Sequence, residues 1–252
     1  MLKARYGIDA PGLVKIFLIV GAVAGFVCAA LAHWARGNLL LGAVAVVCLL
    51  VSTYGLGMFA YMLWSSLVGK VRGREAILDL VTWRGDEHVL DVGCGRGLFL
   101  VGAAKRLTTG RAIGVDLWLA KDQSDNTSAA PMENARLEGV KDRVSVQTAD
   151  MRQLPFPDAS FDVVMSAWVV HNVDAASDRA LAISEMVRVL RPCGTLLLND
   201  IENRDEYEAQ FKRLGLTDIK LVTPSPWLDR LNGLVSFGSF QPATLIGHVG
   251  LA

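Results

Sequence analysis

Residues 89–97 read VLDVGCGRG, and this stretch decides the fold class. A short apolar run ending at Val92 passes directly into a turn with glycine at positions 93, 95 and 97, and a helical pattern follows from Leu98. A glycine-rich turn between a strand and a helix lets backbone N–H groups approach a ligand at the carboxyl end of a strand. The stretch therefore predicts a ligand site near the start of an α/β domain.

Short β-branched runs alternate with helical patterns after this turn. We expect strands at 88–92, 112–116, 144–148, 161–167 and 195–199, and helices at 98–107, 131–138, 176–190 and 204–214. This alternation predicts a Rossmann-like, doubly wound and mostly parallel sheet with helices on both faces. Arg191-Pro192 is expected to end the long helix. Runs at 219–222 and 244–249 are expected to finish the sheet as an antiparallel pair, and 65–81 to form an amphipathic helix with Ile77, Leu78 and Val81 facing inward.

Two long uncharged runs precede the domain, at 16–34 and 39–64. As helices they would be roughly 28 Å and 39 Å long, against about 30 Å for the hydrocarbon core of a bilayer. Neither run has polar residues at a helical period, as a core hairpin of a soluble protein would. A cleaved signal peptide is an alternative, because Ala30-Leu31-Ala32 resembles a cleavage site, but a second run follows at once. We expect a transmembrane helical hairpin over 1–68 and an α/β domain over 69–252.

Basic residues predict the topology of this hairpin. Lys3, Arg5 and Lys15 precede or begin the first run, only Arg36 lies between the runs, and Lys70, Arg72 and Arg74 follow the second. The bias predicts an integral membrane protein with two spans and with both termini and the α/β domain on the cytoplasmic side. Gly21 and Gly25 have the small-xxx-small spacing that lets two helices approach closely, so a homo-oligomer formed through the hairpin is also possible.

Composition excludes several classes of protein. Hydrophobic residues make up 52% of the 252 residues, so disorder is excluded. Residues 1–68 hold four basic residues against one acidic residue, a balance of +3, which leaves 21 against 24 for the remainder. That remainder lacks the basic excess of a nucleic-acid-binding surface. The four cysteines, at 28, 48, 94 and 193, match no metal-ligand spacing, so we expect no metal site and reduced thiols.

Two carboxylates extend the predicted ligand site. Asp116 ends the second strand about twenty residues after the glycine turn, where a carboxylate accepts hydrogen bonds from ribose hydroxyls. Asp150 follows the third strand, where a carboxylate can accept from an adenine amino group; a turn cap is its other interpretation. The glycine spacing is GxGxG, one position short of the dinucleotide fingerprint GxGxxG, and no P-loop motif occurs.

Together these motifs resemble the class I S-adenosylmethionine-dependent methyltransferases, and most closely their branch of ubiquinone and menaquinone C-methyltransferases. The resemblance covers residues 70–200 and rests on VLDVGCGRG, Asp116, Ala149-Asp150-Met151, LPFPDASFDVVMSAWVVHNV and Leu190-Arg191-Pro192-Cys193-Gly194. Cys193 stands where the family has glycine, which implies a different backbone angle in that turn. The resemblance implies S-adenosyl-L-methionine as cofactor. Its implied cofactor-binding residues are Asp91, Gly93, Cys94, Gly95, Gly97, Asp116, Leu117, Asp150, Met151 and Ser166, with Asp91 supporting the turn.

The acceptor side is predicted from the segment that follows the fourth strand. A methyl group on a sulfonium is already activated, so alignment and exclusion of water are the main tasks, and a base helps only an acidic acceptor. His171 is the candidate base or orienting group, although a structural histidine bonded to a loop carbonyl fits as well. Trp118, Trp168 and Asn172 are candidates for acceptor binding. Asp122, Gln123 and Asp125 suit the binding of a polar head group or an ion, or a solvated loop with an N-cap. Residues 227–235 suit an interfacial helix or packing against the sheet.

The sequence thus predicts a membrane-anchored methyltransferase acting on a small, lipophilic or membrane-associated acceptor, because tethering raises the effective concentration of such a molecule. Two other functions share the fold. A nicotinamide-dependent oxidoreductase is disfavoured by the glycine spacing, and a non-catalytic cofactor-binding scaffold on a membrane partner stays open because a cofactor site does not fix a reaction.

Overall fold

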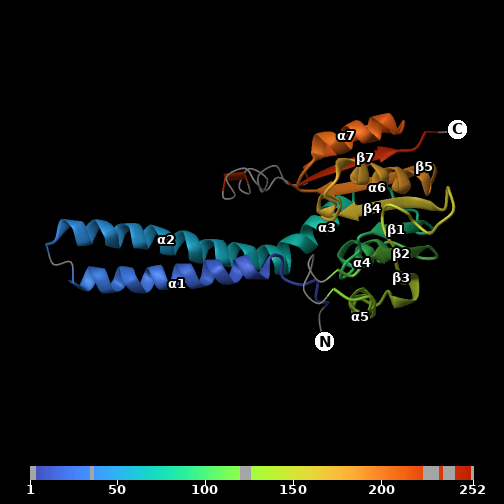
Figure 1. The fold of residues 1–252 in the computed structure, drawn as a ribbon. Helices are drawn as coiled ribbons and strands as arrows, with labels where there is room; N and C mark the ends of the chain where they lie inside the picture. Colours follow the sequence, from blue (N-terminus) through green and yellow to red (C-terminus); the bar gives the residue numbers. More distant parts are fainter. Residues whose placement is uncertain (1–3, 35–36, 120–125, 224–232, 235–241, 251–252) are drawn as a thin grey trace. The chain divides into compact units, whose positions relative to one another are not determined.

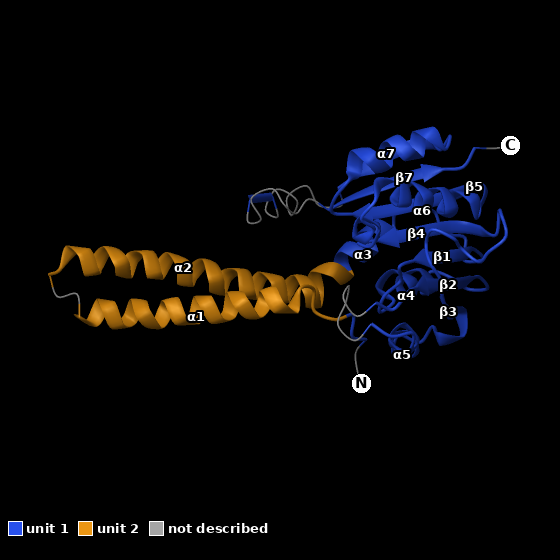
Figure 2. Cartoon of the chain, viewed as in Figure 1, with its two compact units in different colours: residues 1–6, 72–252 blue, residues 7–71 orange. Residues whose placement is uncertain are grey.

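The structure is a computed structural model that describes residues 4–34, 37–119, 126–223, 233–234 and 242–250. Its internal contacts divide the chain into two compact units, which Figure 2 shows in different colours. One unit, here called the hairpin, holds residues 7–71. The other, here called the α/β unit, holds residues 72–252 together with 1–6, so the described residues 4–6 belong with the α/β unit although the hairpin follows them in the chain.

Two long helices form the hairpin. Helix α1 covers Pro11–Trp34 and α2 covers Leu39–Trp64, and they run side by side in Figure 1. Asn38 caps α2, because its side-chain oxygen accepts a hydrogen bond from the N–H of Leu40 at 3.0 Å. Helix α2 has the bounds of the second predicted run, whereas α1 begins at Pro11, a residue suited to the first helical position. By length and composition, α1 and the helical stretch Leu39–Leu78 that begins with α2 could each cross a membrane.

Small residues bring α1 and α2 close together. A Cβ added to Gly21 would lie 2.8 Å from the backbone nitrogen of Leu56, and one added to Gly55 would lie 3.0 Å from the Cα of Gly21. A Cβ on Gly25 would lie 2.8 Å from the hydroxyl oxygen of Ser52. The glycine spacing seen in the sequence therefore serves packing inside one hairpin.

A polar cluster closes the open end of the hairpin. Lys70 donates from Nζ to the carbonyl of Gly7 at 2.7 Å and to the Asp9 carboxylate at 2.9 Å. The N–H of Asp9 donates to the hydroxyl oxygen of Ser66 at 3.0 Å. The Lys70 side chain is only 8% exposed, so this ion pair is better shielded from solvent than an ordinary surface pair.

The α/β unit is built on a seven-stranded mixed sheet with the order β3-β2-β1-β4-β5-β7-β6 (Figure 1). Strands β1 to β5 are parallel to one another, and β7 is antiparallel to both β5 and β6. The predicted Rossmann-like, mostly parallel sheet with an antiparallel C-terminal strand is confirmed. The strands are β1 His88–Val92, β2 Arg111–Asp116, β3 Val144–Thr148, β4 Phe161–Ala167, β5 Leu190–Asp200, β6 Thr217–Val222 and β7 Ala243–His248.

Helices cover both faces of this sheet. The α-helices are α3 Lys70–Leu78, α4 Leu98–Ala104, α5 Ala129–Leu137, α6 Ala176–Arg188 and α7 Arg204–Arg213, and a π-helical turn at Ser65–Gly69 precedes α3. Alternate residues of each strand enter different cores: Val89 packs with residues of α3 and α4, while Leu90 packs with residues of α6 and α7. Ile77, Leu78 and Val81 are buried at the first face, as their spacing predicted.

The connection between α6 and β5 differs from the prediction. Helix α6 ends at Arg188, and Leu190 already pairs with Phe161, so Arg191 and Pro192 lie in a strand rather than at a helix end. The ladder is interrupted between Phe161 and Val163, which is where a sheet tolerates a residue without an N–H. Cys193 has a φ of 62°, a left-handed backbone angle that favours glycine.

Candidate functional site

The predicted site residues lie on one edge of the sheet. Because β1 to β5 are parallel, their carboxyl ends meet at the same edge, where doubly wound folds bind ligands. The glycine turn, here residues 93–97, follows β1, and Asp116 ends β2. Asp150 comes soon after β3, His171 lies after β4, and Asp200 ends β5. The topology thus collects residues that lie far apart in the sequence.

Backbone bonds to β2 hold the glycine turn. The N–H groups of Gly93 and Cys94 both donate to the carbonyl of Val115, at 2.8 and 3.0 Å. Gly93 has a φ of 74° and Gly97 a φ of 79°, angles that other residues rarely adopt. A Cβ on Gly93 would lie 2.5 Å from a methyl carbon of Val169, so the turn has room only for glycine there. Glycine at position 93 is therefore required both by the backbone angle and by the packing of Val169 against the turn.

Asp116 ties the turn to the segment after β2. Its carboxylate accepts hydrogen bonds from the N–H of Gly95 at 2.8 Å, the N–H of Trp118 at 2.7 Å and the side-chain amide of Asn126 at 3.3 Å. An ionised carboxylate offers about four acceptor positions, so these donors leave capacity for a hydroxyl of a bound ligand. Asn126 was absent from the predicted site, since it is the last residue of a polar segment that suits a solvated loop.

Two buried oxygen atoms beneath this edge have no protein partner among the described residues: Oδ2 of Asp91 and Oδ1 of Asn126. Such atoms are uncommon in folded proteins and call for a partner such as a ligand or water. Burial, with a smaller contribution from the Asp116 charge, raises the pKa of Asp91 to about 7. A nearby cation would stabilise the ionised form of this buried carboxyl group, and the ammonium group of a bound amino acid would supply that charge.

Asp150 is engaged by a neighbour that the sequence analysis did not consider. The Arg152 guanidinium donates to both of its carboxylate oxygens, at 3.0 and 2.6 Å, and also pairs with Asp178 at 2.8 Å. The Arg152 hydrogen bond lowers the pKa of Asp150. Asp150 is thus held as a carboxylate, and an adenine amino group would share it with Arg152. Met151 is half-buried against the core beside α6.

Three other predicted cofactor residues differ in exposure. Ser166 is 1% exposed, and its hydroxyl donates to the carbonyl of Val92 at 2.9 Å, so it fastens β4 to β1 rather than facing the open edge. The Cys94 side chain is buried against Gly114, where an added Cβ would lie 2.6 Å from its sulfur, and burial raises the pKa of its thiol. Only its backbone belongs to the turn. Leu117 is 44% exposed beside Asp116.

The predicted acceptor residues follow β2 and β4. Trp118 has a φ of 58°, and its indole N–H donates to the hydroxyl of Thr148 at 2.9 Å, which places the ring across the ends of β2 and β3. Trp168 has a φ of 56° and Asn172 is exposed. A positive φ at tryptophan stores backbone strain, which concentrates at functional sites. Asp122, Gln123, Asp125 and most of 227–235 lie outside the described residues.

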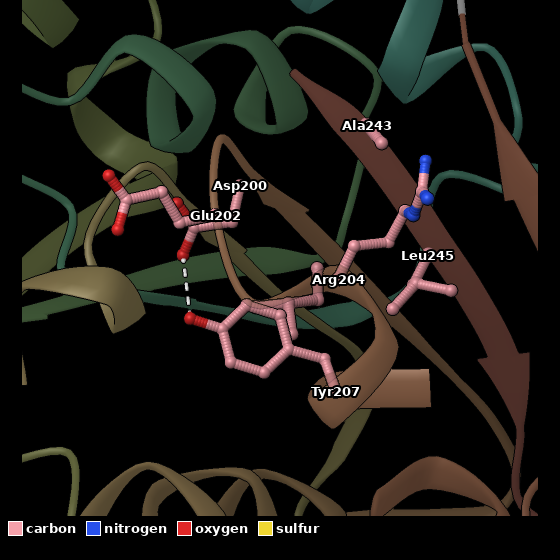
Figure 3. A pocket seen from close by; sticks show the side chains of 7 residues that line it. Asp200, Glu202, Arg204, Tyr207, Ala243 and Leu245 are labelled. Carbon is pink, nitrogen blue, oxygen red and sulfur yellow. Dashed lines mark hydrogen bonds between the residues drawn. The ribbon is translucent and has the colours of Figure 1, made fainter. Parts of the chain in front are cut away.

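His171 forms a pair with Asp200, the residue that ends β5. The distance from Nδ1 of His171 to Oδ1 of Asp200 is 2.5 Å, and the backbone N–H of His171 donates to Oδ2 at 3.1 Å. The Tyr207 hydroxyl donates to the same carboxylate at 3.4 Å (Figure 3). Nδ1 of His171 thus pairs with a carboxylate rather than with a loop carbonyl. Asp200 and Tyr207 were missed because nothing in LLLND or the following helix marks a carboxylate partner.

A small pocket adjoins this pair. It is lined by Leu198, Asp200, Glu202, Arg204, Tyr207, Ala243 and Leu245, at the end of β5 and the starts of α7 and β7 (Figure 3). The lining combines apolar strand residues with charged groups. Among the described residues, no group of three potential ligands could hold a metal ion.

Comparison with known proteins agrees with this geometry. A sequence profile described as "Methyltransferase domain" matches residues 90–198. The chain carries a class I S-adenosylmethionine-dependent methyltransferase domain. Demethylmenaquinone methyltransferase from Symbiobacterium thermophilum is 36% identical over 116 residues, which are 46% of this chain and 43% of that protein. The 27-O-demethylrifamycin SV methyltransferase from Amycolatopsis mediterranei is 27% identical over 194 residues, 64% of this chain and 68% of that protein.

A solved structure has the same fold. It is geranyl diphosphate C-methyltransferase from Streptomyces coelicolor A3(2), in complex with S-adenosyl-L-homocysteine. The two folds superpose with a TM-score of 0.58 at 20% sequence identity, over 75% of this chain and 83% of that protein. This chain spans less than half the length of the demethylmenaquinone relative. S-adenosylmethionine is the cofactor of the methyltransferase domain, and the residues present fit it: a glycine turn, the Asp116 carboxylate and the unpartnered buried oxygen of Asp91.

Proposed function

We propose that the chain is a membrane-anchored methyltransferase that transfers a methyl group from S-adenosylmethionine to a small, lipophilic acceptor. The observation that carries the anchor is the outer surface of the hairpin. Its large apolar side chains point outward, with Phe26 78%, Trp34 76% and Leu39 91% exposed. At about 25 cal/mol per Å² of apolar surface, such exposure to water is costly, whereas a bilayer removes that cost.

The topology follows from both ends of the hairpin. Residues 5 and 6 bond to the α/β unit, which also follows α2 in the chain, and this favours both ends on one side of the membrane. Lys15 and Arg72 flank the spans, against Arg36 between them, and this favours the cytoplasmic side. Arg74 contributes little to the bias because it is 3% exposed within the α/β unit.

His171 is the proposed base. Its Nδ1–Asp200 bond fixes the ring and favours the proton on Nδ1, which makes Nε2 the basic nitrogen. The N–H groups of His171 and Ile201 also donate to Asp200, at 3.1 and 2.8 Å, and keep that carboxylate in place. When bound, S-adenosylmethionine supplies an activated methyl group, which passes to the acceptor as the carbon–sulfur bond breaks and its electron pair returns to sulfur. His171 would accept the proton that the acceptor loses.

The acceptor class is proposed from the anchor and the relatives together. Demethylmenaquinone methyltransferase and a ubiquinone/menaquinone C-methyltransferase from Dinoroseobacter shibae are named for quinones. A quinone-like molecule combines a ring that loses a proton with an apolar tail that partitions into a bilayer. We therefore favour a lipophilic acceptor with a polar, ionisable ring.

Methyl-labelled S-adenosylmethionine tests this proposal. The purified protein is incubated with native membranes, and the products are separated into organic, aqueous and protein fractions. Label in the organic phase is expected, and it should fall by about 100-fold or more in His171→Asn, since general base catalysis contributes about 10²–10⁴-fold. Asp142→Asn, at an exposed position after α5, is the matched control. Label confined to water or protein would exclude a lipophilic acceptor, and binding without any label would favour the scaffold.

A further inference from the structure

Asn134 of α5 holds both the N-terminal segment and the glycine turn. Its side-chain oxygen accepts from the N–H of Arg5 at 2.8 Å, and its amide nitrogen donates to the carbonyl of Arg5 at 3.1 Å and to the carbonyl of Arg96 at 2.9 Å. Asn134 is 2% exposed, so these bonds are shielded from water. Both amide hydrogens are used, one toward the N-terminal segment and one toward the turn.

Arg96 and Tyr6 strengthen the same connection. Nε of Arg96, within the turn, donates to the carbonyl of Arg5 at 2.9 Å. Tyr6 is 7% exposed, and its ring centroid lies 5.7 Å from the guanidinium carbon of Arg74. Arg74 is itself buried and donates to the carbonyl of Leu98 at 3.3 Å, the residue that follows the turn. The N-terminal segment therefore contacts both sides of the turn through side chains that are well packed.

A glycine turn needs such support. Glycine loses more conformational freedom on ordering than any other residue, and Gly93, Gly95 and Gly97 all have positive φ angles. If the turn is ordered before the ligand arrives, the ligand does not have to supply that ordering free energy, and affinity rises. Gly97 also packs on α5, where an added Cβ would lie 2.8 Å from Pro131. Asn134 thus acts from a helix already in contact with the turn.

We propose that residues 4–6, held by Asn134 and Arg96, form a brace that orders the glycine turn for the cofactor. Asn134 and Arg5 are then positioning residues for S-adenosylmethionine, and cofactor affinity depends on the segment that leads into the hairpin. The Arg5 side chain is exposed and its contacts with Asn134 are made by its backbone, so a loss of the N–H matters more than a loss of charge. The proposal rests on the cofactor of the domain and not on the identity of the acceptor.

Titration with S-adenosylhomocysteine tests the brace without any acceptor. The full chain in lipid nanodiscs is compared with two variants. Arg5→Pro removes the N–H group that donates a hydrogen bond to Asn134. Asn134→Asp removes the two hydrogen bonds that the Asn134 amide donates to the carbonyls of Arg5 and Arg96. Each variant is expected to bind about tenfold more weakly by calorimetry, and the double variant no more weakly than the weaker single variant, because both remove one connection. Glu133→Gln, an exposed neighbour on α5, is the matched control and should bind like the wild type.

Hydrogen exchange separates a brace from general destabilisation. In the apo protein, amides of residues 95–99 should exchange several-fold faster in Arg5→Pro, while those of β4 and β5 stay unchanged. If Arg5→Pro binds within twofold of wild type and the turn exchanges at the same rate, the brace is wrong. If affinity falls but exchange quickens throughout the sheet, or if the two variants add fully, the segment only stabilises the fold and the proposal fails as well. None of these outcomes depends on methyl transfer.

Discussion

At the scale of single residues, Asp116 carries the strongest prediction for cofactor binding. Its carboxylate accepts from the N–H groups of Gly95 and Trp118, and an amide in its place would turn a donor toward one of them. Hydrogen bonds to a charged group contribute about 1.5–3 kcal/mol, so Asp116→Asn should weaken S-adenosylhomocysteine binding by about 10–100-fold. Calorimetric titration measures this affinity, with Asp142→Asn as the control. Binding within twofold of wild type would exclude a role for this carboxylate.

Asp91 predicts a pH dependence of stability. Burial raises its pKa to about 7 from 3.8, so between about pH 4 and pH 7 the folded state keeps a proton that the unfolded state has released. Its contribution to the free energy of unfolding therefore falls as the pH rises through that window. Denaturant unfolding of the apo protein should show this loss between pH 5 and pH 7.

The control is Asp91→Asn, which has no carboxyl group to titrate. Its free energy of unfolding should change less over the same interval than that of the wild type. Equal slopes in the two proteins would mean that Asp91 is ionised in the folded state at pH 5. Added S-adenosylhomocysteine should reduce the loss in the wild type, because a cationic ammonium group favours the ionised carboxylate.

Residue patterns predicted the local part of this site and not its long-range pairs. The glycines and Asp116 were predictable because the turn needs positive φ angles and because the end of β2 is fixed by its apolar run. Asp200 and Asn134 were not, since their partners lie 29 and up to 129 positions away in the chain. The packing of Ser166 against Val92 was missed because inward and outward positions look alike at the end of a buried strand.

At the scale of elements, the hairpin depends on contact between two glycines. A Cβ on Gly55 would lie 3.1 Å from the carbonyl oxygen of Phe17 and 3.0 Å from the Cα of Gly21, so a larger side chain must push the helices apart. Gly55→Leu should therefore separate α1 from α2, measured as a longer spin-label distance between the helices in nanodiscs. Gly57→Leu, with nothing within 4 Å of its added Cβ, is the matched control. An unchanged distance in Gly55→Leu would show that the close approach is not required.

Element order was predictable up to the last strands. Short runs rich in β-branched residues predicted β1 to β4 within about a residue of their observed ends, because such runs between turn residues are typical of strands. The start of β5 at Leu190 was not predicted, since Pro192 suggests a helix end and the ladder irregularity that accommodates it is a tertiary feature. The position of β7 between β5 and β6 also has no local signal, because pairing order depends on the whole sheet.

At the scale of the whole molecule, the proposed topology, with two spans and a cytoplasmic α/β unit, predicts which cysteines are accessible from each side. Cys193 is exposed in the α/β unit, whereas Gly37 lies between the two helices and has open space around it. In a background with Cys28→Ala and Cys48→Ala, Gly37→Cys should react with a membrane-impermeant maleimide added outside right-side-out vesicles. Cys193 should react only after the vesicles are opened, since a bilayer separates it from the reagent.

The opposite results discriminate among the remaining arrangements. If both cysteines react only after lysis, the hairpin lies on the cytoplasmic surface without spanning, and its apolar side chains are covered in another way. If Cys193 reacts from outside, the topology is inverted and the basic residues beside the spans do not set it. If Gly37→Cys alone reacts from outside, the proposed topology holds. The α/β unit then shares a compartment with cytoplasmic S-adenosylmethionine, and a lipophilic acceptor would reach it from the cytoplasmic leaflet.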